Sequence, residues 1–307
     1  MSVANVMSSD WLALQRQRAL QGATRPSKAE AGTDDRTSTS VGVAADKGKP
    51  AYCAKFDAMF KETTKLELSS VSGMSDGVNA SALDSGVFDD ARIALKSDAT
   101  QRNRVVNEVK SKLTSDSSSM DDPVIQGMID AMMKGQDNID LYQQIVAGFT
   151  TYFQSVTDVM SRLPNYIKVT TDGDGKQTVR VDTDTLKADL MNNVKDMSVS
   201  VPREQAAAWR AELSPIFDVS DDGVVSVNQD HLNAMLDACN TDLSGVDMAA
   251  YQAWETGFSA EKDNIQNDLQ TIVEKYSHQN SNFDSMVKVL SGSIETLTET
   301  AKAFLQI

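Results

Sequence analysis

The feature that most constrains the fold is an apolar stripe near the end of the chain, which no proline interrupts. Its residues follow one another at steps of three or four once Lys262 and Gln279 fill two steps of seven. The stripe consists of Tyr251, Trp254, Phe258, Ile265, Leu269, Ile272, Tyr276, Phe283, Val287, Leu290, Ile294, Leu297, Ala301 and Phe304. A repeat of about 3.5 residues is typical of a coiled-coil helix. The stripe therefore predicts one helix over residues 251–304, with a length of about 80 Å.

A second stripe predicts the partner of that helix. Asp122 is a suitable N-cap, Pro123 suits the first helical position, and Pro164 stops the pattern. Between them lie Ile125, Met128, Ile129, Met132, Ile139, Tyr142, Val146, Phe149, Phe153, Val156, Met160 and Leu163. Because the two stripes flank one intervening region, we expect the two helices to pair antiparallel.

Two shorter amphipathic segments precede this pair. The first, over residues 51–66, has one apolar face: Tyr52, Phe56, Met59, Phe60 and Leu66. The second, over residues 87–113, has another: Phe88, Ala91, Leu95, Val105, Val109 and Leu113. Because a stretch rich in serine and glycine joins them, they predict a helical hairpin. Residues 1–50 are dominated by small and polar residues from position 21, so we expect a disordered N-terminal or export segment.

In the region between the two long stripes, the spacing of apolar residues is no longer that of one long helix. Strand-like runs at 166–171 and 177–182 flank an Asp-Gly-Asp-Gly turn, and runs at 216–219 and 224–227 flank Asp-Asp-Gly. Three short helices are expected from three apolar groups: Leu186, Leu190, Met191 and Val194; Trp209 and Leu213 after Pro202; and Leu232, Met235 and Leu236.

The sequence thus predicts a mainly α fold with four parts. These are an N-terminal segment (1–50), a helical hairpin (51–120), a long antiparallel coiled coil (121–164 and 248–307) and a small inserted α/β module (165–247). We expect the module to form the outward end, because it holds 15 acidic and 7 basic residues of a chain whose net charge is −15.

Composition excludes several classes of function. A strongly acidic chain lacks the basic footprint that nucleic-acid binding needs. No apolar run approaches the roughly 18 residues of a membrane span. Cys53 and Cys239 are far apart in sequence and outside any metal-type spacing, so we interpret them as packed thiols.

Catalytic and metal motifs are also missing from the sequence, so we expect no enzyme activity, no cofactor and no metal. The run that begins at Asp172 resembles an EF-hand start, but Lys176 stands at its fifth position and no glutamate stands at its twelfth. His231 and His278 belong to no cluster at ligand spacing. Nucleophile elbow, P-loop and dinucleotide fingerprints do not occur.

A polar band interrupts the long stripe where the seam should be apolar. We take its candidate residues to be Tyr276, His278, Gln279, Asn280, Asn282 and Phe283. Two interpretations stay open. The band is either a polar layer that fixes helix register, as a buried asparagine does in coiled coils, or a surface where a partner protein or a small amphipathic ligand docks.

Several segments resemble one known family. They are residues 87–92, 152–161, 251–254, 262–268 (Lys-Asp-Asn-Ile-Gln-Asn-Asp), 274–284 (Glu-Lys-Tyr-Ser-His-Gln-Asn-Ser-Asn-Phe-Asp), 287–292 and 300–307. Together they resemble the type III secretion needle-tip proteins, the IpaD/SipD/BipD family. The resemblance covers roughly residues 87–307, and it is dense over the last sixty.

The resemblance implies a protein that is secreted through the type III apparatus and sits at the bacterial surface as a small ring, a pentamer, on the needle tip. Its partners would be the needle subunit, other copies of itself, hydrophobic translocator proteins and bile salts as a cue. The hairpin would act as a built-in chaperone for the coiled coil. Leu305 and Ile307 fall off the apolar stripe, so we expect a needle or protomer interface at Lys288, Thr298, Lys302, Phe304, Leu305 and Ile307.

Two other classes remain open from the sequence. One is a coiled-coil scaffold or export chaperone that stays in the cytoplasm. The other is a hydrolytic effector, whose activity would depend on His231 or His278.

Overall fold

The computed structural model describes residues 50–65, 83–115, 123–171 and 173–305. These described residues belong to one compact unit. Its helices are α2 (Ala51–Thr64), α4 (Gly86–Ser115), α5 (Pro123–Ser161), α6 (Thr183–Asn193), α7 (Ala206–Leu213), α8 (Asp230–Ala238) and α9 (Met248–Leu305), with 3-10 turns η1 (Leu163–Tyr166) and η2 (Arg203–Gln205). None of the helices in these ranges is apolar over a long enough stretch to cross a membrane.

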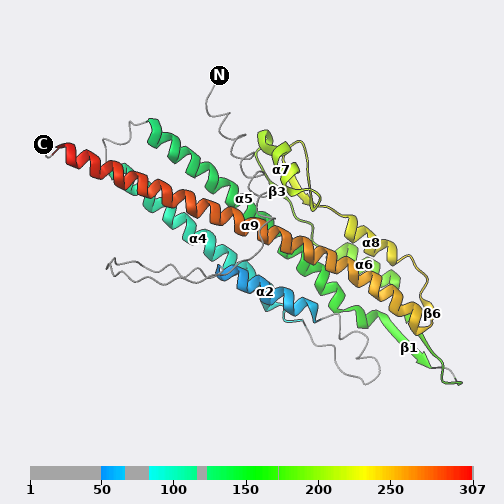
Figure 1. Cartoon of the computed structure of the whole chain (residues 1–307). Coiled ribbons are helices and arrows are strands. Elements are labelled where there is room, and N and C mark those ends of the chain that lie inside the picture. Colours follow the sequence, from blue (N-terminus) through cyan, green and yellow to red (C-terminus); the bar gives the residue numbers. More distant parts are fainter. Residues whose placement is uncertain (1–49, 66–82, 116–122, 172, 306–307) are drawn as a thin grey trace, which may run out of the picture. The chain divides into compact units, whose positions relative to one another are not determined.

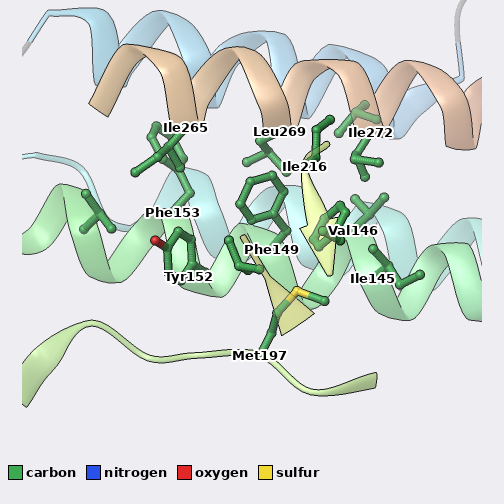
Figure 2. Close-up of a cluster of buried hydrophobic side chains, with 14 of the residues drawn as sticks. Ile145, Val146, Phe149, Tyr152, Phe153, Met197, Ile216, Ile265, Leu269 and Ile272 are labelled. Carbon is green, nitrogen blue, oxygen red and sulfur yellow. The ribbon is translucent and has the colours of Figure 1, made fainter. Parts of the chain in front are cut away.

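Helices α5 and α9 lie side by side along most of the length of α5 (Figure 1). Gly135 near the start of α5 faces Phe283 and Met286 late in α9, and a Cβ added to this glycine would lie only 2.9 Å from the Met286 methyl carbon. Phe153, late in α5, instead lies beside Ile265 in the first half of α9 (Figure 2). The expected antiparallel coiled coil is therefore confirmed, and we call α5 and α9 the helix pair.

The apolar stripes form the core of the helix pair. Every stripe residue of α9 from Ile265 to Leu290 is at most 5% exposed. In Figure 2, Phe149 and Phe153 of α5 point toward Ile265, Leu269 and Ile272 of α9. Burying an aliphatic or aromatic side chain contributes about 1.5–3 kcal/mol, so this seam supplies a large share of the stability.

The hairpin of α2 and α4 packs against the helix pair, and the predicted face of α4 is buried at Phe88, Ala91, Leu95 and Val109 but not at Val105. Val105 is 41% exposed, whereas Val106 is 1% exposed. The buried positions run through Leu95, Ala99, Arg102 and Val106 at steps of three and four. Because an arginine occupies one seam position, a search for apolar residues missed this register. Predicted face residues Leu66 and Leu113 lie outside the side chains that the structure describes.

The module holds two antiparallel three-stranded sheets, ordered β1-β2-β6 and β3-β5-β4. The strands are β1 (Ile167–Thr171), β2 (Gln177–Val181), β3 (Val199–Ser200), β4 (Phe217–Val219), β5 (Val224–Val227) and β6 (Ser244–Val246). Both expected hairpins are present. Strands β3 and β6 were not expected, because strands of two or three residues are too short to show an alternating apolar pattern.

Two further details of the module follow from local geometry. Gly223 has φ +84°, and a Cβ there would lie 2.3 Å from the carbonyl oxygen of Val201, so the turn between β4 and β5 requires glycine. Helix α6 buries Leu186 and Leu190. Met191, which the sequence analysis grouped with them, is instead 66% exposed.

Adjacent residues of α9 test the seam directly. Leu290 is 2% exposed, whereas Val289 is 66% exposed. We expect Leu290→Asp to lower the free energy of unfolding by at least about 3 kcal/mol, because it places an unpaired charge in an apolar seam. Val289→Asp should change it by no more than about 0.5 kcal/mol. Urea unfolding followed by circular dichroism measures both, and equal effects would contradict the seam assignment.

Candidate protein-interaction site

Five of the six predicted interface residues, Lys288 to Leu305, lie in the last part of α9. Lys288 is exposed on this helix. Burial raises the pKa of the Asp284 carboxyl, one turn earlier, and the charge of Lys288 opposes that shift. The side chains of Thr298, Lys302, Phe304 and Leu305 lie outside the described part of the chain, and so does Ile307 as a whole. Helix α9 has 58 residues and α5 has 39, so α9 continues where α5 offers no partner.

The described side chains near that end face solvent. They are Glu295, Thr296, Glu299, Thr300 and Ala303. Apolar stripe residues from Ile265 to Leu290 are buried, and Ile294 is half-buried against the core. This end of α9 therefore offers an exposed helical surface, and the interface assigned to it stays a prediction.

The polar band of α9 does not form one surface. Its buried members are Tyr276, Asn280 and Phe283, at 0%, 6% and 4% exposure. His278 and Asn282 are exposed, and Gln279 is half-buried. Consequently the buried members are available only to the protein's own core, and a docking role stays a prediction for the three others.

The two buried polar members belong to a network around Arg102 of α4. The Arg102 side chain is 2% exposed. Its Nη1 donates to Asn280 Oδ1 (2.9 Å) and to the Tyr276 hydroxyl (3.1 Å), and its Nη2 donates to Asp140 Oδ1 of α5 (2.8 Å). Charge-assisted bonds of this kind are about twice as strong as neutral ones. One side chain of the hairpin thus binds both members of the helix pair.

Asp98, one turn before Arg102, completes this network. Its carboxylate lies 3.2 Å from Arg102 Nη1 and accepts a hydrogen bond from the Tyr276 hydroxyl (2.7 Å). Burial raises the pKa of the Tyr276 phenol. The edge of Tyr52 of α2 covers the Tyr276 ring at 5.2 Å between centroids. We call Asp98, Arg102, Asp140, Tyr276 and Asn280 the arginine network.

A second buried cation joins α9 to the end of α2. Lys262 fills one of the two gaps in the stripe, and it is 1% exposed. Its Nζ donates to the carbonyl of Thr63 (3.4 Å), in the last turn of α2, and lies 3.2 Å from Asp263 Oδ1. Thr63 also donates its hydroxyl hydrogen to Gln266 Oε1 (2.8 Å). A positive charge at a helix C-terminus is favourable, so Lys262 stabilises the docked position of α2.

The module is fixed to the helix pair by polar contacts at α7 and α8. The Tyr142 hydroxyl of α5 donates to Glu212 Oε1 (2.9 Å), and Lys275 of α9 donates to the Glu212 carbonyl. Trp254 Nε1 of α9 donates to the Ala238 carbonyl (3.1 Å). These contacts link the module to α5 and α9 at several points along their length.

Sequence reasoning missed Asp98, Arg102 and Asp140. Arginine and aspartate on a helix are usually solvated, so neither residue type indicates burial. The available signal was the position of Arg102, which lies three and four residues from buried Ala99 and Val106. The spacing of Arg102 from its neighbours in the seam, and not its residue type, could have identified it as buried.

The two cysteines are free thiols. Burial raises the pKa of the Cys239 thiol to about 11, so it is protonated and unreactive near neutral pH. Cys53 of α2 is half-buried, with its Sγ 3.9 Å from the Ser277 hydroxyl. Across the described ranges, no group of three histidine, cysteine, aspartate or glutamate residues is arranged to hold a metal ion.

Comparison with known proteins assigns the chain to a family. Residues 72–305 match the family described as type III secretion systems tip complex components. The chain belongs to this family. The expected resemblance is therefore confirmed for the helix pair, the module and α4.

Its relatives include the translocator protein BipD of Burkholderia mallei and that of Burkholderia thailandensis. They are 45% and 46% identical over 231 residues, which are 72% of this chain and 73% of each relative. A solved structure of BipD from Burkholderia pseudomallei matches with a TM-score of 0.69 at 41% identity, over 82% of this chain and 95% of the other. The family is thus described by its tip-complex role, and these relatives are described as translocator proteins.

The arginine network can be tested with a matched pair of arginines on α4. We expect Arg102→Ala to lower the free energy of unfolding by about 2–3 kcal/mol, because it leaves Asp98 and Asp140 partly buried without their counter-charge. Arg104 is exposed on the same helix, and Arg104→Ala should change stability by no more than about 0.5 kcal/mol. Chemical denaturation compares the two, and a similar small effect for both would show that the network contributes little.

Proposed function

We propose that this chain caps the needle of a type III secretion apparatus, controls secretion there and supports insertion of the translocators into host membranes. The observation that carries the proposal is the family match over residues 72–305, which includes the helix pair and the whole module. Its fold supports the same role, because the acidic module packs beside the first half and the middle of α9, at Trp254 and Lys275, and the exposed end of α9 lies further along the helix (Figure 1).

In this proposal the end of α9 binds the needle subunit and neighbouring protomers, and the module faces outward. The interface comprises Lys288, Thr298, Lys302, Phe304, Leu305 and Ile307. The length of α9 beyond α5 supports this polarity, because an unpartnered helix end is free to join another helical assembly. The chain would be secreted through the apparatus and assemble as a pentameric ring at the bacterial surface.

The remaining partners are inferred from the family alone. Hydrophobic translocator proteins would contact the outward end of the ring. A bile salt or another amphipathic cue is a further proposed partner, and the outward residues His278, Gln279 and Asn282 are the part of the polar band that such a ligand could reach.

We also propose that the hairpin shields the helix pair before assembly. Helix α2 has 14 residues, a length that is marginal for an isolated helix. It buries Tyr52, Phe56 and Met59 at 1% exposure or less. Phe88 of α4 packs on Phe153 of α5, with ring centroids 6.0 Å apart. Removing these aromatic side chains would leave an apolar strip of α5 and α9 in contact with water.

The docking proposal predicts a loss of binding without a loss of stability. We expect the double variant Leu305→Asp, Ile307→Asp to change the free energy of unfolding by no more than about 0.5 kcal/mol, as surface substitutions do. The same variant should no longer bind needles. The measurement is immunogold electron microscopy of intact needles with an antibody against the module. Wild-type needles should be labelled at their distal ends, and needles of the double variant should not.

A matched control places the same type of charge far from the proposed interface. Met191 is 66% exposed on α6 of the module, and Met191→Asp should leave tip labelling intact. Labelled tips on the double variant, or a large drop in its stability, would refute the docking surface. Wild-type protein retained in the cytoplasm during induced secretion would instead favour the scaffold or chaperone alternative.

The shielding proposal predicts that deletion of residues 51–113 promotes self-association. The exposed apolar strip should bind a hydrophobic dye such as ANS more strongly and drive formation of oligomers. Light scattering coupled to gel filtration, together with dye fluorescence, measures both effects. A deletion protein that stays monomeric with unchanged dye binding would contradict the proposal.

A further inference from the structure

His231 lies between two carboxylates at the contact of the module with the helix pair. It is the second residue of α8, and its Nδ1 is 2.8 Å from Glu261 Oε2 of α9. Its Nε2 is 3.6 Å from Asp268 Oδ2, two turns further along α9. Both ring nitrogens therefore face an acidic oxygen. The three side chains are 33%, 27% and 29% exposed, so water reaches them but does not surround them.

In the described part of the chain, the ion pairs of the His231 ring are with carboxylates. Helix α8 packs chiefly on α9, and the charged groups that α9 presents to the ring are Glu261 and Asp268. Asn264 of α9 donates to the same Glu261 oxygen at 3.3 Å. On α8 itself the adjacent charged residue is Asp230, which is exposed.

The ring can satisfy both carboxylates only when it is protonated. An imidazolium has two N–H donors, whereas a neutral imidazole has one donor and one lone pair. In the neutral form one nitrogen lone pair therefore faces a carboxylate oxygen. Burial already raises the pKa of the Asp268 carboxyl, and the charge of His231 opposes that shift. Loss of that charge leaves two partly buried carboxylates on one face of α9 without a cation from α8.

We propose that His231, Glu261 and Asp268 form a protonation-dependent clasp that holds α8 against α9 more tightly in mild acid than at neutral or alkaline pH. The direction follows from charge, since protonation adds attraction to both carboxylates. Histidine as a residue type changes its charge between about pH 5 and 8, so the test compares one pH from each end of that range. The inference concerns the attachment of the module, and it does not depend on the proposed role at the needle tip.

The test exploits the fact that the chain has two histidines. Amide hydrogen exchange of α8 in the full-length protein is measured at pH 5.5 and 8.0 and corrected for the intrinsic rate. We expect protection of α8 in the wild type to be about fivefold higher at pH 5.5, the effect of two partly exposed ion pairs. His231→Gln should abolish this difference. His278→Gln, which alters an exposed histidine elsewhere on α9, should preserve it.

A second variant keeps the histidine and removes one carboxylate charge. Asp268→Asn should reduce the pH dependence of α8 protection by about half, and it serves if His231→Gln fails to fold. The clasp is refuted if His231→Gln retains the wild-type pH dependence, if His278→Gln loses it, or if protection falls on acidification.

Discussion

The packing of α5 against α9 is the interaction on which the other elements depend. Each helix presents one apolar face, and neither face could remain in water along such a length. The hairpin packs on this helix pair, and the module contributes Met197 and Ile216 to the same cluster of buried side chains (Figure 2). The elements therefore share one core, and a change in the seam affects all of them.

Buried polar groups then determine how the hairpin sits on that core. Apolar contacts alone would tolerate a helix that slides by one turn, because aliphatic side chains of similar size exchange places at little cost. Arg102 permits no such shift, since its donors must meet Tyr276, Asn280 and Asp140 together. Lys262 adds a second fixed point at the end of α2. Stability thus comes from the seam, whereas register comes from two buried cations.

The sequence was sufficient for the architecture because long periodic helices leave a strong pattern. Both stripes, the hairpin and the two β-hairpin turns could be read in this way. The arginine network could not, because a buried charge looks like a surface charge until its phase is compared with neighbouring buried residues. The short strands β3 and β6 exist through pairing with β5 and β2, which no local pattern encodes. His231 drew attention only as a lone histidine, since its carboxylate partners lie 30 and 37 residues away.

The insertion of the module between α5 and α9 has a consequence for the order in which the chain can fold. During synthesis, which starts at the N-terminus, α5 is complete long before α9, because the entire module separates Ser161 from Met248. During that interval the seam of α5 has no C-terminal partner. Helix α4 has already emerged, and it offers Phe88 to Phe153 and Arg102 to Asp140. The N-terminal hairpin is thus the first partner that α5 meets, and α9 completes a packing arrangement that local contacts have begun.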